Sequence, residues 1–460
     1  MRVKASKPSA PLRGEIQVPG DKSITHRAVL FGALAHGVSN VETNVLGRDN
    51  FSTIRIMQQL GVRIESKLTK KMFELAKEEQ IQNIEEISGD KCHITVYGAQ
   101  GKFLPFDKEL DCGNSGTTSR LLCGVLAGSS NRYTLTGDAS LKSRPFKRVT
   151  DPLSQMGAKF SGDRLPLSIQ GGSLRGISYH SPKSSAQVKS AILLAGLFSK
   201  EPVEVFEPAQ SRDHTERMFT AMGVPVEEHA IDGAWRVRLS DDATKRTLQG
   251  ISLTIPGDFS AAAFFMVAGS VIPESHILIR NVGVSKTRTG LLSVLLRMGA
   301  DIELKNHRLQ GGEEVADIEV RAKKLSAVKV THEDVVLAID EIPAFCIAAA
   351  LAEGTSDIFG AEELRVKESD RLAMMAAVLR DFSIEPSERE DGMSIIGLNG
   401  RPLVKAQSQG SWRKSGDHRI AMNGAILDYI STGKFEIDDV HAVETSFPTY
   451  AQCFQGLIGE

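Results

Sequence analysis

The sequence predicts an α/β protein built from six related repeats, and three observations point to that class. An alanine-rich apolar run that opens on small polar residues recurs six times along the chain. An amphipathic helix pattern stands between the runs, and strand-like segments such as residues 131–138 and 164–172 accompany it. Self-similarity at a spacing of about 75 residues is typical of folds made of repeated supersecondary units.

The first run, residues 19–35, begins like a helix N-terminus. Asp21 or Ser23 can cap this helix through a side-chain oxygen. Lys22 and Arg27 bring positive charge to backbone N–H groups that lack an intrahelical partner. Since cations there oppose the helix macrodipole, the pattern indicates a site for an anion. The alternative is a solvated helix end with incidental basic residues.

The alanine-rich runs themselves predict buried helices. A helix that is apolar around most of its circumference is buried, and small side chains let such helices approach closely. Generic core helices would also explain the runs, but the polar start recurs with each run, which favours a shared role for the helix starts. The later copies are residues 112–128, 183–197, 257–270, 340–354 and, in a more degenerate form, 416–427.

The amphipathic segments predict a second helix in each repeat. Four of them close on a glycine, where a helix C-cap favours positive φ, and strand-like residues come next. We therefore expect helix followed by strand. The four segments are residues 51–64, 148–160, 212–226 and 288–302, with Gly61, Gly157, Gly223 and Gly299 at the caps. Weaker versions are residues 367–382 and 448–460.

Chain length and the restart of the pattern predict two lobes. A chain of 460 residues exceeds what one core normally supports. The pattern restarts near residues 249–252, so we expect one lobe over residues 22–249 and a second over residues 1–21 plus 250–460. The residues before the first run are expected to complete the last repeat of the second lobe. Residues 66–90 are charge-rich and break the pattern, which predicts a surface insertion.

Composition argues against several classes of function. The formal net charge of -2 gives no general attraction for nucleic acid or membrane, so anion binding must come from local groups. The five cysteines never stand in CxxC spacing, which disfavours disulfides and zinc and fits a cytoplasmic location. With no apolar signal region and no apolar run of about 18 residues, we expect neither export nor a membrane span. HExxH, EF-hand, Walker A and GxSxG patterns are absent, so we expect no metal and no cofactor.

Basic and acidic residues gather near the starts of the repeats. Arginine suits bidentate capture of carboxylate or phosphate, and lysine suits a point charge at a bridging oxygen. Each acidic residue can be a cap, a partner for a cation, or an acid or base in catalysis. We expect transfer between anionic small molecules by positioning and acid/base chemistry. The basic set is Lys22, Arg27, Arg120, Arg144, Arg148, Lys189, Arg212, Lys367, Arg371 and Arg419. The acidic set is Asp258, Asp340, Glu341, Glu368, Asp370 and Asp417.

Seven segments follow one another along nearly the whole chain: PGDKSITHRA, CGNSGTTSRLL, SLKSRPF, SSAQVKSA, LRVKESDRL, GDHRIAM and TSFPTY. Together they closely resemble the 5-enolpyruvylshikimate-3-phosphate (EPSP) synthase family. The resemblance implies a two-lobed inside-out α/β barrel of six βαβαββ repeats, three per lobe, with the active site in the cleft between the lobes. It implies transfer of the enolpyruvyl group of phosphoenolpyruvate to the 5-hydroxyl of shikimate 3-phosphate, with release of phosphate. It further implies a cytoplasmic monomer in the shikimate pathway of aromatic amino-acid biosynthesis.

The resemblance also assigns roles to individual residues. Asp340 corresponds to the base that accepts the proton of the 5-hydroxyl. Glu368 and Lys22 are both candidates for protonating the methylene carbon and assisting the departure of phosphate. The set implied for shikimate 3-phosphate is Lys22, Ser23, Arg27, Ser185, Ala186, Gln187, Arg212, Asp340 and Lys367. The set implied for phosphoenolpyruvate is Lys22, Gly116, Arg144, Gln187, Arg371 and Arg419.

Two positions bear on differences within the family. Gly116 corresponds to a tight turn against phosphoenolpyruvate, where a missing side chain leaves room. Family members that tolerate the herbicide glyphosate can carry alanine there, whereas SLKSRP, SAQVKSAILLAGL and TSFP are closer to the tolerant branch, so the response to glyphosate as an inhibitor stays open. Thr445 stands where one branch has a lysine before its TFP-like motif, so one phosphoenolpyruvate contact is expected to be absent or supplied elsewhere.

Three alternatives stand beside this interpretation. UDP-N-acetylglucosamine enolpyruvyl transferase shares the repeat fold, but it typically has a reactive cysteine or aspartate on a loop before its RP motif, where this chain reads GDASLKSRPF. A non-catalytic anion-binding protein on the same repeats is disfavoured because Lys22, Asp340 and Glu368 are all present. An RNA-terminal-phosphate cyclase would bind nucleotide and RNA, for which the near-neutral charge gives no support.

Overall fold

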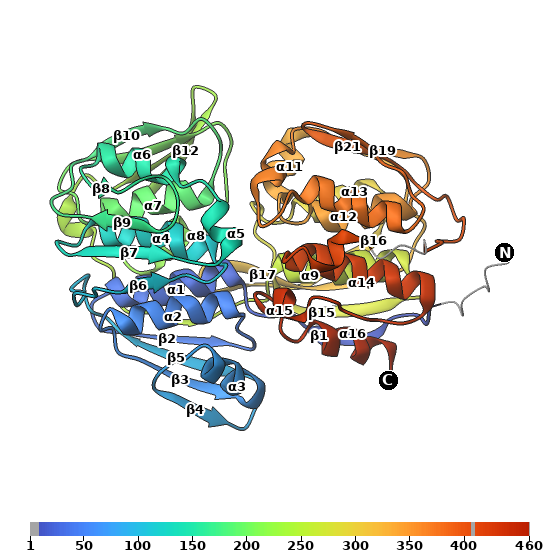
Figure 1. Ribbon diagram of the computed structural model, residues 1–460, viewed down its shortest axis with the longest axis horizontal. Coiled ribbons are helices and arrows are strands. Elements are labelled where there is room, and N and C mark those ends of the chain that lie inside the picture. Colours follow the sequence, from blue (N-terminus) through green and yellow to red (C-terminus); the bar gives the residue numbers. More distant parts are fainter. Residues whose placement is uncertain (1–8, 406–409, 460) are drawn as a thin grey trace. The chain divides into compact units, whose positions relative to one another are not determined.

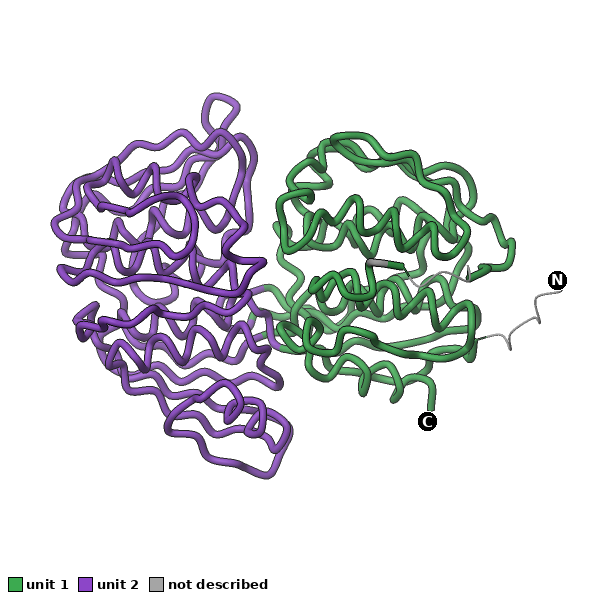
Figure 2. Tube along the Cα trace, in the orientation of Figure 1, with its two compact units in different colours: residues 1–19, 256–309, 314–460 green, residues 20–255, 310–313 purple. Residues whose placement is uncertain are grey.

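The computed structural model describes residues 9–405 and 410–459, which form two compact units. Figure 2 colours the two units along the chain. The first unit spans residues 1–19, 256–309 and 314–460, and the second spans residues 20–255 and 310–313. Each unit has its own hydrophobic core.

Three buried helices form the centre of the second unit (Figure 1). They are α1 (Lys22–Leu34), α4 (Gly116–Ala127) and α7 (Ala186–Gly196). Helices α4 and α7 cross so closely that a Cβ atom on Gly124 would lie 2.2 Å from the carbonyl oxygen of Ala191. Only a residue without a side chain fits this crossing, which is the close approach that the small residues predict.

The first unit has the same arrangement of three buried helices. They are α9 (Phe259–Val271), α12 (Ile342–Leu351) and α14 (His418–Thr432). Every residue of α9 from Phe259 to Ser270 is buried. The prediction of six buried helices at the six alanine-rich runs is therefore confirmed.

The amphipathic segments form the second helix of each repeat, as predicted. The four glycines expected at their ends have positive φ: 88° at Gly61, 113° at Gly157, 89° at Gly223 and 87° at Gly299. Other residues are strained in this backbone region, which explains why glycine closes these helices. The helices are α2 (Arg48–Gln59), α6 (Lys147–Gln155), α8 (His214–Ala221), α10 (Gly290–Arg297), α13 (Arg371–Asp381) and α16 (Tyr450–Ile458). Shorter ones are α3 (Lys70–Glu78), α5 (Ala139–Ser143), α11 (His332–Ala338), α15 (Val440–Glu444), η1 (Ala243–Lys245), η2 (Glu362–Val366) and η3 (Ser411–Lys414).

Five sheets of one topology lie against the buried helices of the two units. In each sheet the first two strands pair in parallel, and the last strand of the repeat lies between the second and the third. This is the order that a βαβαββ repeat produces. The second unit holds three of these sheets. The strand order of the first is β14 (Ser252–Thr254), β2 (Val38–Thr43), β5 (Cys92–Tyr97), β3 (Ile64–Thr69) and β4 (Ile84–Ile87). The second has the order β6 (Glu109–Asp111), β7 (Arg132–Thr136), β9 (Leu167–Gln170) and β8 (Lys159–Phe160), and the third has the order β10 (Ile177–His180), β11 (Val203–Glu207), β13 (Ala234–Leu239) and β12 (Val226–Ile231). The first unit holds β1 (Arg13–Gln17)-β15 (His276–Gly283)-β17 (Glu313–Arg321)-β16 (Asp301–Gln310) and β18 (Lys329–Val330)-β19 (Thr355–Ile358)-β21 (Gly392–Ile396)-β20 (Ser387–Arg389).

Two strands are exchanged between repeats that are far apart in the sequence. β1 precedes α1 but pairs with β15, Arg13 opposite His276. β14 precedes α9 but pairs with β2, Ser252 opposite Asn40. The prediction that the N-terminal residues complete the last repeat is therefore wrong, because β1 completes the sheet of the fourth. The change of unit falls after Ile255, beyond the expected boundary at residue 250, since β14 belongs to the sheet of β2.

The segment expected as a surface insertion is partly integrated into the second unit. β3 runs on to Thr69, and β4 adds a fifth strand in parallel with it. Leu68, Met72 and Leu75 are buried in the core. Residues 66–90 are therefore an extension of the first sheet rather than a surface insertion alone, because their apolar positions have a sheet edge to cover.

The sixth repeat differs from the others. Within the described residues after Arg401, it contributes η3, α14, α15 and α16 and no strand. None of the helices in the described part of the chain is long and apolar enough to cross a membrane.

Candidate active site

Lys22 opens α1, and the structure gives its ammonium group a carboxylate partner. Asp21 caps the helix, its Oδ1 accepting a hydrogen bond from the N–H of Ile24 at 2.9 Å. Lys22 Nζ lies 2.9 Å from Oδ2 of Asp49, in the first turn of α2. The Lys22 side chain is 17% exposed, so Asp49 holds the charge at the edge of the interior. Sequence reasoning missed Asp49, for which an acidic residue in the first turn of a helix was the only local signal.

Arg27, one turn further along α1, is buried and held mainly by uncharged groups. Its guanidinium donates to the hydroxyl of Thr215 at 2.7 Å, to the hydroxyl of Ser190 at 2.7 Å and to the carbonyl of Ser23 at 3.0 Å. Burial lowers the pKa of Arg27 to about 10, with Glu216 the largest opposing influence. Arg27 therefore remains charged at neutral pH and joins α1 to α7 and α8.

The start of α4 gathers two guanidinium groups around Gly116. A Cβ atom at this glycine would lie 2.6 Å from Nη1 of Arg120 and 3.2 Å from Nη1 of Arg144. Arg144 donates to Oδ1 of Asn114 at 2.8 Å, and Arg120 donates to Oε1 of Gln187 at 3.1 Å. Two guanidinium groups beside the free N–H groups of a helix start make a cradle for an anion. Gly116 makes room for them.

A buried lysine on α7 forms ion pairs with the end of β11 and with α8. Lys189 Nζ lies 3.0 Å from Oε2 of Glu207 and 2.7 Å from Oε1 of Glu216. Burial alone would lower the pKa of Lys189, but Glu216 and Glu207 outweigh it and raise the pKa. Glu207 also accepts from the N–H of Ser185 at 2.7 Å and from the hydroxyl of Ser211 at 2.9 Å. The lysine was noted in the sequence as basic, but its role is internal.

The other predicted residues of the second unit lie at the ends of these networks. Ser185 caps α7, Ala186 and Gln187 form its first turn, and Arg212 follows Ser211. Ser23, in the first turn of α1, is half-buried like the four residues just placed. Hydrogen bonds therefore link the starts of α1, α4 and α7, which carry predicted binding residues of this unit. The groups that make them are Arg27, Arg120 and Glu207.

In the first unit, Arg371 gathers three carboxylates at the start of α13. It donates from Nη1 to Asp340 at 3.1 Å, from Nε to Asp417 at 2.9 Å and from Nη2 to Glu368. Arg371 is 1% exposed. Burial alone would lower its pKa, but Asp417, Glu368 and Asp340 together raise it well above the ordinary value. The charged guanidinium holds both candidate catalytic carboxylates in place.

Arg419 lies on the other side of Asp340. Its Nη2 is 3.8 Å from Oδ2 of Asp340, and its backbone N–H donates to Oδ1 of Asp417 at 3.0 Å. Asp417 caps α14 and is fully buried. Asp417 thus positions both Arg371 and Arg419, the arginines of this unit that were predicted to bind phosphoenolpyruvate. The GDHRIAM motif did not by itself indicate this role for Asp417.

Lys367 and Thr445 flank this cluster along the chain. Lys367 follows η2, immediately before Glu368, and is half-buried. Thr445 follows α15; its hydroxyl donates to the carbonyl of Ala442 at 2.6 Å and lies 3.5 Å from Nδ1 of His418. Thr445, which stands where one branch of the family has a lysine, therefore lies next to His418, the residue before Arg419.

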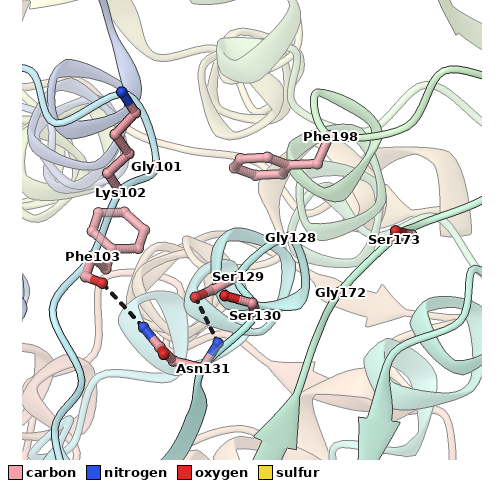
Figure 3. A pocket seen from close by; sticks show the side chains of 10 residues that line it. All are labelled: Gly101, Lys102, Phe103, Gly128, Ser129, Ser130, Asn131, Gly172, Ser173 and Phe198. Atoms are coloured by element: carbon pink, nitrogen blue, oxygen red, sulfur yellow. Dashed lines mark hydrogen bonds between the residues drawn. The ribbon is translucent and has the colours of Figure 1, made fainter.

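The second unit has a separate pocket of about 490 Å³ that none of the predicted residues lines (Figure 3). Gly128 is the C-cap of α4, and Phe198 follows the end of α7. The pocket thus lies near the C-terminal ends of two helices, where the helix dipole disfavours an anion, and Lys102 is the one charged residue among those that line it. Figure 3 shows Asn131 donating to the carbonyl of Phe103, a hydrogen bond between two residues that line the pocket. Its position does not suit the predicted substrates.

In the parts of the chain that the structure describes, no three His, Cys, Asp or Glu side chains are grouped so as to hold a metal ion. The described cysteines are all free thiols, and four of the five are buried. Burial raises the pKa of Cys123 and of Cys346 to about 12, so neither is a thiolate at neutral pH.

Comparison with known proteins gives one consistent family. The family model described as EPSP synthase (3-phosphoshikimate 1-carboxyvinyltransferase) matches residues 6–86 and 69–454. The 3-phosphoshikimate 1-carboxyvinyltransferase of Citrifermentans bemidjiense is 43% identical over 98% of this chain and 98% of its own. That of a Geobacter species, strain M21, is 44% identical over 98% of each chain.

Solved structures agree with the sequence comparison. An EPSP synthase from Acinetobacter baumannii superimposes with a TM-score of 0.79 at 36% identity, covering 98% of this chain and 97% of that one. The enolpyruvyl transferase NikO from Streptomyces tendae gives a TM-score of 0.68 at 13% identity over 98% of this chain and 96% of its own, which is a likeness of fold alone. The predicted α/β fold of the enolpyruvyl transferases is confirmed.

Proposed function

The chain belongs to the EPSP synthase family, and on that premise we propose that it transfers the enolpyruvyl group of phosphoenolpyruvate to the 5-hydroxyl of shikimate 3-phosphate. The C–O bond to phosphate breaks, a C–O bond to the 5-oxygen forms, and the hydroxyl proton leaves with the products. The observation that carries the proposal is the meeting of Asp340, Glu368, Arg371 and Arg419 in one cluster within a chain that matches this family along its length.

We infer that each unit supplies part of the machinery. In the second unit, the cradle of Gly116, Arg120 and Arg144 suits the carboxylate and phosphate of phosphoenolpyruvate. Ser185 and Arg212, which flank the Glu207 network, suit the phosphate of shikimate 3-phosphate. The other residues proposed for shikimate 3-phosphate there are Ser23, Arg27, Ala186 and Gln187, with Lys22 and Gln187 shared between the substrates.

In the first unit, Asp340 is the proposed base for the 5-hydroxyl, and it also binds shikimate 3-phosphate together with Lys367. Arg371 and Arg419 flank Asp340 and supply positive charge for phosphoenolpyruvate. Glu368 and Lys22 are the two candidates for protonating the methylene carbon and for assisting the departing phosphate; a proton is lost from the same carbon when phosphate leaves. A lysine oriented by a carboxylate, as Lys22 is by Asp49, suits stabilisation of the phosphate oxygen that gains charge.

We further propose that the enzyme acts in the cytoplasm as a monomer and that glyphosate competes at the phosphoenolpyruvate cradle. Support for the last point is the pair of guanidinium groups, of Arg120 and Arg144, beside Gly116, which would attract an anionic inhibitor as they would phosphoenolpyruvate.

The direct test measures phosphate release by the purified protein. Phosphoenolpyruvate is supplied with shikimate 3-phosphate in one arm and with UDP-N-acetylglucosamine in another. Release that depends on shikimate 3-phosphate supports the proposal. Release only with the nucleotide sugar would assign the alternative transferase, and binding without release in either arm would leave an anion-binding protein.

A further inference from the structure

A buried chain of side-chain hydrogen bonds runs from α1 through α2 to the cap of α4. Nδ1 of His26 lies 2.7 Å from Oγ1 of Thr53, which lies 2.7 Å from Oγ1 of Thr118. The Thr118 hydroxyl donates to Oγ of Ser115 at 2.7 Å. All four residues are fully buried. We call His26, Thr53, Thr118 and Ser115 the hydroxyl chain; the family resemblance gives none of them a role.

The direction of the hydroxyl chain follows from its chemistry. Burial, and after it Lys22 and Arg27, lowers the pKa of His26 well below the ordinary value, so the ring is neutral. Because Thr118 donates to Ser115, its oxygen accepts from Thr53, and Thr53 in turn accepts from His26. The imidazole proton is thereby assigned to Nδ1.

The hydroxyl chain ends at the anion cradle. Oγ of Ser115 accepts the N–H of Thr118 at 3.1 Å and so caps α4. The next residue is Gly116, beside which Arg120 and Arg144 lie. At its other end, His26 stands one turn after Lys22, the first residue of α1. The chain therefore ties the helix start that carries the cradle to the helix start that carries Lys22.

We propose that the hydroxyl chain positions the start of α4 for binding phosphoenolpyruvate, an inference that rests on the proposed function. A local cap would need only Ser115 and Thr118, which are neighbours on one helix turn. The extension to Thr53 and His26 adds two more helices and leaves Nε2 of His26 buried without a hydrogen-bond partner among the described residues. A buried unpaired nitrogen is unfavourable for folding. The unpaired nitrogen of His26 is explained if the hydroxyl chain as a whole orients the cradle at the start of α4.

The test compares two substitutions at one position. Thr53→Val removes the hydroxyl and nearly preserves the shape of the side chain, whereas Thr53→Ser keeps the hydroxyl. Initial rates of phosphate release are measured with each substrate varied in turn. For Thr53→Val we expect KM for phosphoenolpyruvate to rise about fivefold, the ratio that one net hydrogen bond supplies. KM for shikimate 3-phosphate should stay at the wild-type value, and Thr53→Ser should restore both constants.

Thermal melting shows whether Thr53→Val folds. If it does not, two substitutions of His26 still test the proposal. His26→Asn retains an N–H donor near the position of Nδ1 and should behave as wild type, whereas His26→Leu should behave as expected of Thr53→Val. Ser39→Ala is the control. It removes another fully buried hydroxyl of the same unit, one that accepts from the N–H of Ile251 instead.

The outcomes separate the inference from its premise. A wild-type protein that releases no phosphate from the two substrates overturns the proposed function and, with it, the inference. An active wild type whose Thr53→Val or His26→Leu variant matches Ser39→Ala in both KM values overturns the inference alone. An equal rise in both KM values would also overturn it, because that result means a general loss of structure.

Discussion

Nη1 of Arg371 donates to Oδ1 of Asp340 at 3.1 Å, which joins the proposed base to a cation that is almost fully buried. The same guanidinium also holds Asp417 and Glu368. Arg419 lies beside Asp340 as well, with its Nη2 3.8 Å from Oδ2. Guanidinium groups beside both oxygens fix the orientation of this carboxylate, which suits the proton uptake proposed for Asp340.

Replacing Asp340 by asparagine should abolish most of the turnover while the fold survives. The change removes the proposed base, and Arg371 keeps its contacts with Asp417 and Glu368. We expect kcat to fall at least about 100-fold, the lower end for loss of a general base. Phosphate release measures kcat, and urea unfolding checks stability. The control is Glu303→Gln, an exposed acid of the same unit; near-normal turnover of Asp340→Asn would mean that another group is the base.

Replacing Arg144 by alanine should impair the use of phosphoenolpyruvate. Arg144 is 4% exposed and helps form the cradle at Gly116, so an anion bound there would lose a desolvated partner. We expect kcat/KM for phosphoenolpyruvate to fall, and the fall should correspond to a loss of about 2 to 5 kcal/mol of transition-state stabilisation. Arg132→Ala, an exposed arginine on β7, should leave the constants unchanged. Equal kinetics for the two variants would remove Arg144 from the site.

Stability should fall as pH rises through the range in which Glu228 titrates. Burial chiefly, with Glu216 and Asp213, raises the pKa of Glu228 from an ordinary 4.5 to about 7. Because the pKa is raised in the folded state, the contribution of Glu228 to the free energy of unfolding is fully present below about pH 4.5 and is lost as pH rises through about 7. Glu228→Gln should therefore stabilise the protein at pH 8 by about 1 kcal/mol, discounted for partial solvent screening, and have little effect at pH 4.5.

The measurement is the free energy of urea unfolding at the two pH values. Glu227→Gln is the matched control, because Glu227 is the preceding residue of β12 and is exposed. A gain for Glu228→Gln that is the same at both pH values would contradict the titration argument.

Adding one methyl group at Gly124 should destabilise the second unit. The new Cβ would lie 2.2 Å from the carbonyl oxygen of Ala191, so α4 and α7 would have to move apart. We expect Gly124→Ala to cost about 1 to 3 kcal/mol, as overpacking does. Gly456→Ala is the control: this helical glycine on α16 has open space where the Cβ would stand, so alanine should be neutral or stabilising by up to about 1 kcal/mol. Thermal melting of both variants decides, and equal melting temperatures would refute the crossing argument.

Features that depend on residues close together in the chain could be predicted from the sequence. Gly61 and Gly299 close helices with positive φ, and Asp21 caps α1 as its position before an apolar run indicates. The six buried helices and the family follow from the same kind of local pattern, because capping and helical periodicity act over a few residues.

Pairings across long stretches of chain were decided only by the tertiary structure. Lys22 finds Asp49, Lys189 finds Glu207 and Glu216, and β1 leaves its own repeat to pair with β15. A carboxylate or a hydroxyl has many equivalent partners in a sequence, whereas in the fold only those that the buried helices bring within hydrogen-bond distance can act. Local chemistry thus determined the elements and their polar starts, and the meeting of helix ends in three dimensions determined which of those groups work together.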